Sequence, residues 1–287
     1  MTRLTTINNT YDSYQSLISF YEENKDKMFD DIHLELRHFF SANMSAALGA
    51  VLDIFTSNLN DIHFDYISPR IETILLKNDF LTYYGKKRAI DNNNTTIKFQ
   101  KLKTTDGKYF KNYVIEELIE GHIADLPRMS EGVKEKILEA IYEIFVNAQI
   151  HSETQFIYTC GQFFPNKSKI EFTIVDTGIG FKNRINKRFN SNLNATQAIK
   201  WAIQDRKTTK EGISGGIGLA VLKEFIEKNK GKIQIVSSDG FYQFDCDGEV
   251  SKLTEGQFPG TIVNLQFRTD DINNYSLKSE IDVNDIF

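Results

Sequence analysis

Three short segments lie in a fixed order in the second half of this 287-residue chain, each at the end of a predicted helix or strand. They are Glu143-Ile-Phe-Val-Asn147, Asp176-Thr-Gly-Ile-Gly180 and Gly215-Gly-Ile-Gly218-Leu219. Each segment alone is a weak signal, because carboxylates and glycines are common in turns and on helix surfaces. Their order and their chemistry together constrain both the fold and the function.

The first segment belongs to a predicted helix over residues 131–152, with Ser130 as the expected N-cap. One face is apolar, and the other carries a row at i, i+4 spacing made of Glu135, Glu139, Glu143, Asn147 and His151. Stacked glutamates repel one another by a few tenths of a kcal/mol per pair, so the row does not serve helix stability. A solvated acidic face is the alternative. We expect Asn147 to hold Mg²⁺ beside phosphate oxygens, while Glu143 reaches a water molecule as a general base.

The second segment follows the predicted strand 169–175, so that the Asp176 carboxylate emerges at a strand end. A carboxylate in this position can accept a hydrogen bond from the exocyclic amine of adenine. Gly178 and Gly180 would let the backbone approach a flat base where a β-carbon would collide. An ordinary turn is the alternative interpretation of the same residues.

The third segment opens a predicted helix over residues 219–228. Gly216, Gly218 and Leu219 would place free backbone N–H groups at the positive helix end, an arrangement that cradles phosphates. The spacing differs from the dinucleotide-binding pattern of a Rossmann unit. It is not a P-loop either, because no Lys-Ser or Lys-Thr pair follows the last glycine.

Between the second and third segments, residues 181–212 carry a positive charge. They hold eight basic residues against two acidic ones, which is eight minus two, or +6, in a chain of net charge -5. Such a loop is attracted to polyphosphate and can close over it as a lid. Lys207 and Lys210, which lie nearest the third segment, are the expected phosphate contacts; a solvated basic surface is the alternative.

These motifs, together with the late Gly260-Thr261 pair, resemble the GHKL ATP-binding fold of histidine kinases, anti-sigma-factor kinases, gyrase and MutL. The resemblance covers residues 97–270. It implies ATP and Mg²⁺ as cofactors, with Asn147 as the Mg²⁺ ligand, Glu143 as the general base, Asp176 on adenine and Thr261 helping to hold the base. Ala220 is a departure, since many members carry a further glycine there, and it puts only the lid geometry in doubt.

Residues 1–90 look like a STAS domain. Residues 40–52 and 67–80 are similar to the strand-to-helix turn and the last helix of that fold. The serine that is phosphorylated in anti-sigma-factor antagonists aligns near Ala46, so phosphate acceptance is not expected there, and Ser45 is the nearest hydroxyl. His33-Leu-Glu-Leu-Arg37 superficially resembles the phosphoacceptor box of sensor kinases, but its alternation indicates a strand.

The predicted fold is α/β in the broad sense (α+β): a two-layer α/β sandwich of GHKL type, with helices on one face of a mixed sheet, after a smaller STAS-like domain. We place the domains at residues 1–90 and 97–270, joined by a polar run over residues 86–96 and followed by a polar tail at 271–287. Predicted helices cover residues 12–28, 41–59, 69–81, 113–120, 131–152 and 219–228. Predicted strands cover 32–40, 62–67, 155–163, 169–175, 232–237 and 261–267, and the basic segment 181–214 is expected to be irregular.

Composition excludes several classes of function. No apolar run reaches the 18 to 20 residues or so of a membrane span, and no signal-peptide core opens the chain, so a cytoplasmic protein is expected. A pI near 5.6 argues against a general nucleic-acid-binding surface. A protein partner bound through the N-terminal domain, and a homodimer, are compatible with this organisation.

Three functions remain open. The chain is an ATP-dependent regulator that phosphorylates or switches a partner, an ATP-hydrolysing clamp of the gyrase or MutL type, or a non-catalytic ATP-sensing module. The lack of a credible acceptor histidine on a dimerisation helix and of a long C-terminal clamp domain favours the first or the third.

Overall fold

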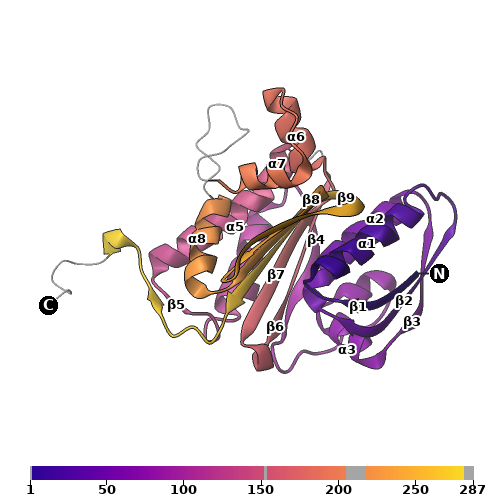
Figure 1. Cartoon of the computed structure of the whole chain (residues 1–287). Coiled ribbons are helices and arrows are strands. Elements are labelled where there is room, and N and C mark those ends of the chain that lie inside the picture. Colours follow the sequence, from indigo (N-terminus) through magenta and orange to yellow (C-terminus); the bar gives the residue numbers. More distant parts are fainter. Residues whose placement is uncertain (1, 152–153, 205–217, 281–287) are drawn as a thin grey trace.

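The computed structural model describes residues 2–151, 154–204 and 218–280, with the backbone alone at residue 151. Within these ranges the chain is a mixed assembly of helices and strands built on two open sheets (Figure 1). The α+β class expected from the sequence is therefore observed. Residues 85–95, which include most of the polar run, contain no helix or strand and connect the two sheets.

The N-terminal unit is a parallel three-stranded sheet in the order β1-β2-β3. Its elements are β1 (Thr2–Ile7), α1 (Tyr11–Asn24), β2 (Asp31–Phe40), η1 (Ala42–Met44), α2 (Ser45–Ser57), β3 (Asp61–Ile67), α3 (Pro69–Lys77) and η2 (Phe80–Tyr84). The predicted helices and strands of this unit are confirmed, apart from ends that differ by a few residues. Strand β1 was missed, because its six residues carry only two buried side chains.

The second unit is a five-stranded sheet in the order β4-β6-β7-β9-β8. Its strands are β4 (Thr96–Lys103), β6 (Phe156–Phe164), β7 (Lys169–Asp176), β8 (Lys232–Asp245) and β9 (Gly248–Arg268), with the turn η4 (Pro165–Lys167) between β6 and β7. Every described pairing in this sheet is antiparallel, so the expected mixed sheet is wrong. Tight turns join β6 to β7 and β8 to β9, and a tight turn permits only antiparallel pairing, which accounts for two of the four pairings.

The helices of the second unit are α4 (Gly107–Tyr113), the π-helical η3 (Val114–Glu120), α5 (Glu131–His151), α6 (Gly180–Phe189), α7 (Ala195–Ala202) and α8 (Gly218–Asn229). Ser130 Oγ accepts a hydrogen bond from Val133 N, as expected of the N-cap of α5. The prediction that residues 181–214 are irregular is wrong for the described part, which forms α6 and α7. A capping box between Asn194 and Gln197 starts α7, and this sequence signal was overlooked.

The C-terminal tail, as far as residue 280, packs against the second unit. Strand β10 (Asn274–Tyr275) pairs with β5 (Arg128–Met129), and the short η5 (Lys278–Glu280) follows. The Glu280 carboxylate accepts hydrogen bonds from Ser130 Oγ and Gly132 N, so the tail closes the start of α5.

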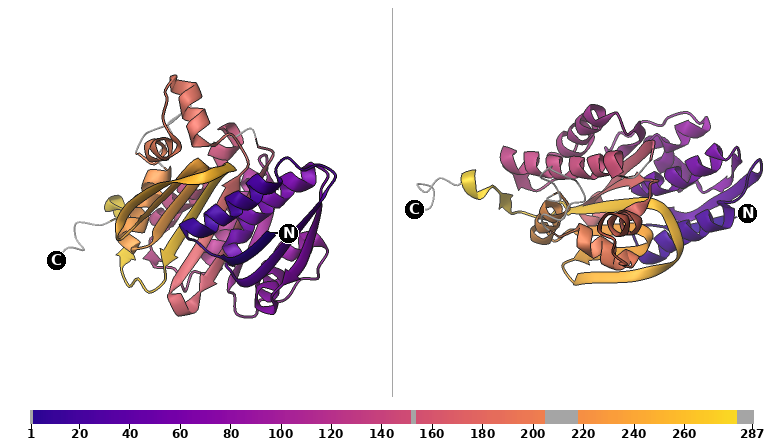
Figure 2. Two further views of the ribbon diagram at one scale, coloured as in Figure 1. Left: turned by 45° about the vertical axis from the view of Figure 1, so that its right-hand side comes forward. Right: turned by 90° about the horizontal axis from the view of Figure 1, so that it is seen from above.

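The five-stranded sheet is buried on both faces (Figure 2). Phe172 and Ile174 of β7 face the core shared with α4 to α8, whereas Val175 belongs to the core shared with α1 and α2. Side chains alternate along a strand, so one strand contributes to both cores. The helices of residues 97–270 thus lie on one face, and the N-terminal unit covers the other.

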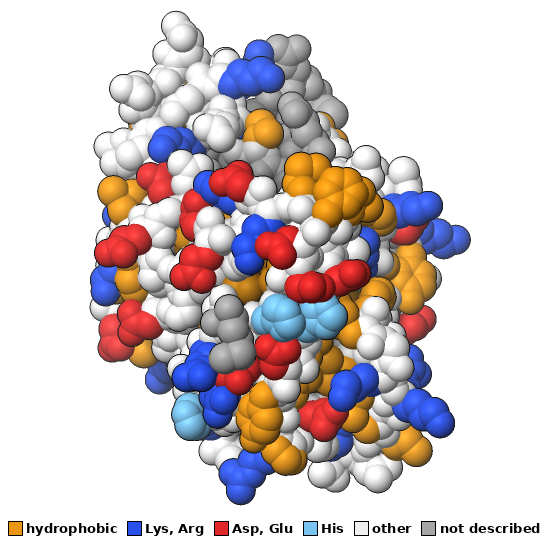
Figure 3. Space-filling model, turned by 90° about the vertical axis from the view of Figure 1, so that its right-hand side faces the viewer, with side chains coloured by type: hydrophobic (Ala, Val, Ile, Leu, Met, Phe, Trp, Pro, Cys, Tyr) orange, Lys and Arg blue, Asp and Glu red, His pale blue; other side chains and the backbone are white. Residues whose placement is uncertain are grey.

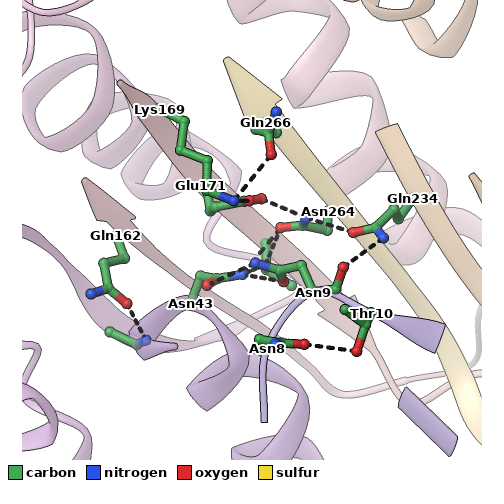
Figure 4. Close-up of polar contacts among 12 residues, drawn as sticks. Asn8, Asn9, Thr10, Asn43, Gln162, Lys169, Glu171, Gln234, Asn264 and Gln266 are labelled. Atoms are coloured by element: carbon green, nitrogen blue, oxygen red, sulfur yellow. Dashed lines mark hydrogen bonds and ion pairs between the residues drawn. The ribbon is translucent and has the colours of Figure 1, made fainter. Parts of the chain in front are cut away.

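A buried polar network joins the two units at this covered face (Figure 4). Asn43 Nδ2 donates to Asn9 Oδ1, Thr173 Oγ1 and Asn264 Oδ1 at 2.8, 2.9 and 3.2 Å. Asn264 Nδ2 in turn donates to the oxygens of Glu171 and Gln234 at 2.8 and 3.1 Å. A buried polar group is costly unless it is paired, so the network fixes one docking position for the N-terminal unit.

The outer face of the small sheet is open to solvent (Figure 3). His33 and His63, on neighbouring strands, stack with ring centroids 4.9 Å apart, and each contacts a carboxylate, Asp65 and Asp31 respectively. His33 lies on β2, as the alternation of its segment indicates. Ser45 is fully buried and accepts a hydrogen bond from Asn78, so its hydroxyl is inaccessible.

The network predicts a large effect of the substitution Asn264→Ala. It removes two donated and two accepted hydrogen bonds and leaves the oxygens of Glu171 and Gln234 with fewer donors at a buried site. The free energy of unfolding, measured with urea, should fall by about 3 kcal/mol. Asn93→Ala, at an exposed position, should change it by less than about 0.5 kcal/mol. Equal effects of the two substitutions would contradict this role.

Candidate functional site

The three motif segments meet in one pocket between α5, α6, α8 and β9. Ten described residues line it: Ile144, Asn147, Ala148, Asp176, Gly180, Phe181, Arg184, Leu219, Thr261 and Val263. Five of them, Asn147, Asp176, Gly180, Leu219 and Thr261, are residues that the sequence predicts for the site. The free volume is about 30 Å³, room for one or two water molecules.

Asp176 ends β7, and its carboxyl group enters the pocket. One carboxyl oxygen accepts a hydrogen bond from Gly178 N at 2.8 Å, and the backbone pairs with Thr261 of β9. The residue keeps some solvent exposure, yet protein atoms surround the carboxyl group. This desolvation raises the pKa of Asp176 to about 6, against smaller lowering effects of Gly178 N–H and of the Arg184 charge. The raised pKa shows that no group of the described structure fully compensates the charge of this carboxylate.

Gly180 is required by the protein itself. Its φ is +70°, and a β-carbon there would lie 2.7 Å from Ser238 Oγ and 2.9 Å from Ser237 Oγ. Ser237 Oγ also accepts the Phe181 N–H at 2.9 Å and lies 3.1 Å from Thr261 Oγ1. The sequence prediction attributed this glycine to the approach of a base, whereas the structure supplies a second reason within the fold. Gly178 is not one of the described glycines whose φ is positive.

Glu143 lies on α5 one turn before Asn147 and contacts the start of α8. Its Oε2 accepts the Gly218 N–H at 2.7 Å. The Gly218 N–H, which the sequence predicts as a phosphate contact, donates to this carboxylate in the described structure. The first N–H groups of a helix lack partners inside the helix, so a nearby carboxylate takes one of them. A β-carbon on Gly218 would lie 2.8 Å from Glu143 Oε2, which explains the glycine by close packing of α5 on α8.

Arg184 of α6 is the pocket residue that the sequence analysis did not single out. It was counted only as one of eight basic residues between the second and third motif segments. Its guanidinium carbon lies 5.3 Å from the ring centroid of Phe181, and its Nε has no hydrogen-bond partner in the structure. It lies on the same helix face as Phe181, three residues earlier, but Arg188 lies on that face too, so no sequence signal singles out Arg184.

Several predicted site residues lie outside the described residues. These are Lys207, Lys210 and Gly216, all of which fall within residues 205–217. The described part of the basic segment places Lys182 against Asp239 and Lys200 near Glu249. Only Arg184, of its described basic residues, lines the pocket.

A scan against protein-family models finds no matching family, and a search of curated proteins finds no match. None of the described helices is both long and apolar enough to cross a membrane.

Two of the described glycines with positive φ in and near this sheet, Gly180 and Gly248, allow a matched test. Gly180→Ala adds a crowded β-carbon to left-handed backbone, whereas Gly248→Ala adds one at φ +105° with no atom within 4 Å. We expect Gly180→Ala to lower the free energy of unfolding by about 3 kcal/mol and Gly248→Ala by about 1 kcal/mol. Chemical denaturation measures both. Equal losses would show that the two serine hydroxyls do not crowd Gly180.

Proposed function

We propose that this chain is a Mg²⁺-ATP-binding regulatory protein of the histidine kinase-like (GHKL) type, with a STAS-like N-terminal unit. In this proposal it acts as a protein kinase or as an ATP-driven switch on a protein partner. The observation that carries the proposal is the meeting of Asp176 and Asn147 in one pocket, although 29 positions separate them in the sequence.

The two residues offer the chemistry that ATP needs at its two ends. Asp176 offers a desolvated carboxylate to the adenine amine, and Asn147 offers an amide oxygen to Mg²⁺, which prefers oxygen ligands and bridges phosphates. Leu219, Ala148 and Val263 give the pocket the apolar walls that a purine ring requires. A carboxylate and an amide in an apolar pocket thus match a molecule with a flat base and a charged tail.

The chain fold supports the same proposal. An antiparallel sheet carries α5 and α8 on one face, and the Asp-x-Gly-x-Gly turn follows its central strand β7. The contact between Glu143 and Gly218 links α5 to the start of α8, next to the basic segment expected as a lid. Nucleotide phosphates and Mg²⁺ arriving beside Glu143 would compete with this contact. That competition favours a switch in which nucleotide alters the start of α8.

The N-terminal unit offers the surface for a partner. Its outer sheet face is exposed, while its inner face is fixed to the ATP-binding unit by the buried network. A partner bound to the outer face would therefore contact the unit that the buried network joins to β7. A second copy of this chain, bound through the same face to form a homodimer, is one candidate for that partner.

Nucleotide binding is the first test. Calorimetry with Mg²⁺ present should detect ATP uptake by the wild-type protein, and Asn147→Ala should weaken it about tenfold or more by removing the amide oxygen from Mg²⁺. Gln149→Ala, an exposed amide on the same helix, is the matched control and should bind as the wild type does. Without Mg²⁺ the difference between Asn147→Ala and the wild type should disappear. No ATP uptake by the wild type would refute the proposal.

Incubation with terminally labelled ATP separates the three functions. Label on a protein, added as lysate or purified partner, supports the kinase. Free phosphate that is lost in Glu143→Gln, with binding retained, supports the clamp, and neither product supports the sensor.

The raised pKa of Asp176 predicts a pH dependence. Only the ionised carboxylate accepts well from the adenine amine, so adenosine affinity should be constant above pH 7 and fall as the pH drops through about 6. At pH 5 about a tenth of the carboxyl groups are ionised, and affinity should be about tenfold lower than at pH 8. Asp176→Asn should bind weakly with a flat profile. Adenosine is used because it has no titrating phosphate. A flat wild-type profile would exclude Asp176 as the acceptor.

A further inference from the structure

The Arg184 side chain carries a hydrogen-bond donor that no described residue pairs, in the same pocket as Asp176. Arg184 lies on α6, one turn after Gly180, and its side chain turns into the pocket that Asp176 lines. Its Nε is inaccessible to solvent and has no hydrogen-bond partner among the residues that the structure describes. No hydrogen bond or ion pair joins it to Asp176 within the described residues, although the two charges influence each other.

This arrangement is costly for the protein without a ligand. Burial lowers the pKa of Arg184 to about 10, because the charged form loses its hydration, and the Asp176 charge offsets only part of that loss. An arginine on an exposed helix normally keeps its charged head in water. Neighbouring basic residues do so: Lys187 and Arg188 of the same helix are exposed. A hydrogen-bond acceptor from outside the chain that pairs with the Arg184 guanidinium would explain this position.

We propose that Arg184 is a second base-recognition residue, which donates a hydrogen bond to a ring nitrogen of the purine beside the amine that Asp176 accepts. The inference rests on the proposed function and extends it to the chemistry of base selection. Adenine presents its amine donor next to an acceptor on each edge, N1 on one side and N7 on the other. A carboxylate and a guanidinium in one pocket present the complementary order, acceptor beside donor.

Space in the pocket fits this role. The free volume of about 30 Å³ has room for only one or two water molecules, so the entry of a base requires lining side chains to move, and we expect the long Arg184 side chain to be one of them. Rotation about the side-chain bonds moves the guanidinium aside while its helix holds it on the pocket wall. Its planar head can then meet the edge of the base or stack against it, as it now lies against Phe181.

Adenosine is the probe that isolates this contact, because it has no phosphate for a cation to attract. Arg184→Met keeps an unbranched stem as far as the Nε position and removes the donors, and it should lower the affinity for adenosine and for Mg²⁺-ATP by the same factor, about tenfold. Arg188→Met removes the same charge from an exposed position of α6 and should leave adenosine affinity unchanged. Calorimetry measures these affinities and those of the wild type.

The outcomes separate this inference from the proposed function. Unchanged or tighter adenosine binding by Arg184→Met would overturn the inference, because the side chain would then only fill the empty pocket. A loss of affinity for ATP alone would overturn it too, because Arg184 would then contact a phosphate. A wild type that takes up neither ligand would instead overturn the proposed function.

Purine analogues test the same contact without a variant. For the wild type, either 1-deazaadenosine or 7-deazaadenosine should bind about tenfold more weakly than adenosine, and Arg184→Met should no longer discriminate against that analogue. Equal binding of both analogues and adenosine by the wild type would overturn the inference, whether or not the variant folds.

Discussion

Strand β7 is the element on which the rest of the structure depends. Its side chains enter both cores: Phe172 and Ile174 pack against α5 and α8, and Val175 packs against the N-terminal unit. Its last residue, Asp176, opens into the pocket. A strand buried on both faces and paired on both edges cannot shift without disturbing each core. The position of the carboxylate is therefore set by packing on both sides of the sheet, and its raised pKa follows from the same burial.

This constraint also links the two units. The buried network ties Asn9 and Asn43 of the N-terminal unit to side chains of β7, β8 and β9, and Asp176, the last residue of β7, pairs with Thr261 of β9 at the pocket. A partner that strains the N-terminal unit would act on the sheet that carries Asp176 at the pocket. The contact of Glu143 with Gly218 adds a second adjustable point, where α5 meets the start of α8. Regulation by this route requires that partner and nucleotide favour different positions of one of these contacts.

Much of this could be predicted from the sequence, and the failures have physical causes. The helix of Glu143 and Asn147 and the strand ending at Asp176 follow from the spacing of their apolar residues, which matches a helix in the first and a buried strand in the second. Helices α6 and α7 were missed, because a basic composition hides short amphipathic turns. The full length of the β8–β9 hairpin could not be predicted from local sequence. The half of the hairpin nearer its turn packs on α1, which lies more than 200 residues earlier in the chain. Arg184 could not be chosen among eight basic residues, since only the fold shows which one turns inward.

The most direct measurement is a crystal structure of the protein with Mg²⁺ and a non-hydrolysable ATP analogue. The account predicts adenine in the pocket between α5 and β9, with its amine within hydrogen-bond distance of the Asp176 carboxylate and Mg²⁺ on Asn147 Oδ1. Nucleotide bound elsewhere on the molecule, or adenine in this pocket with its amine turned away from Asp176, would contradict it.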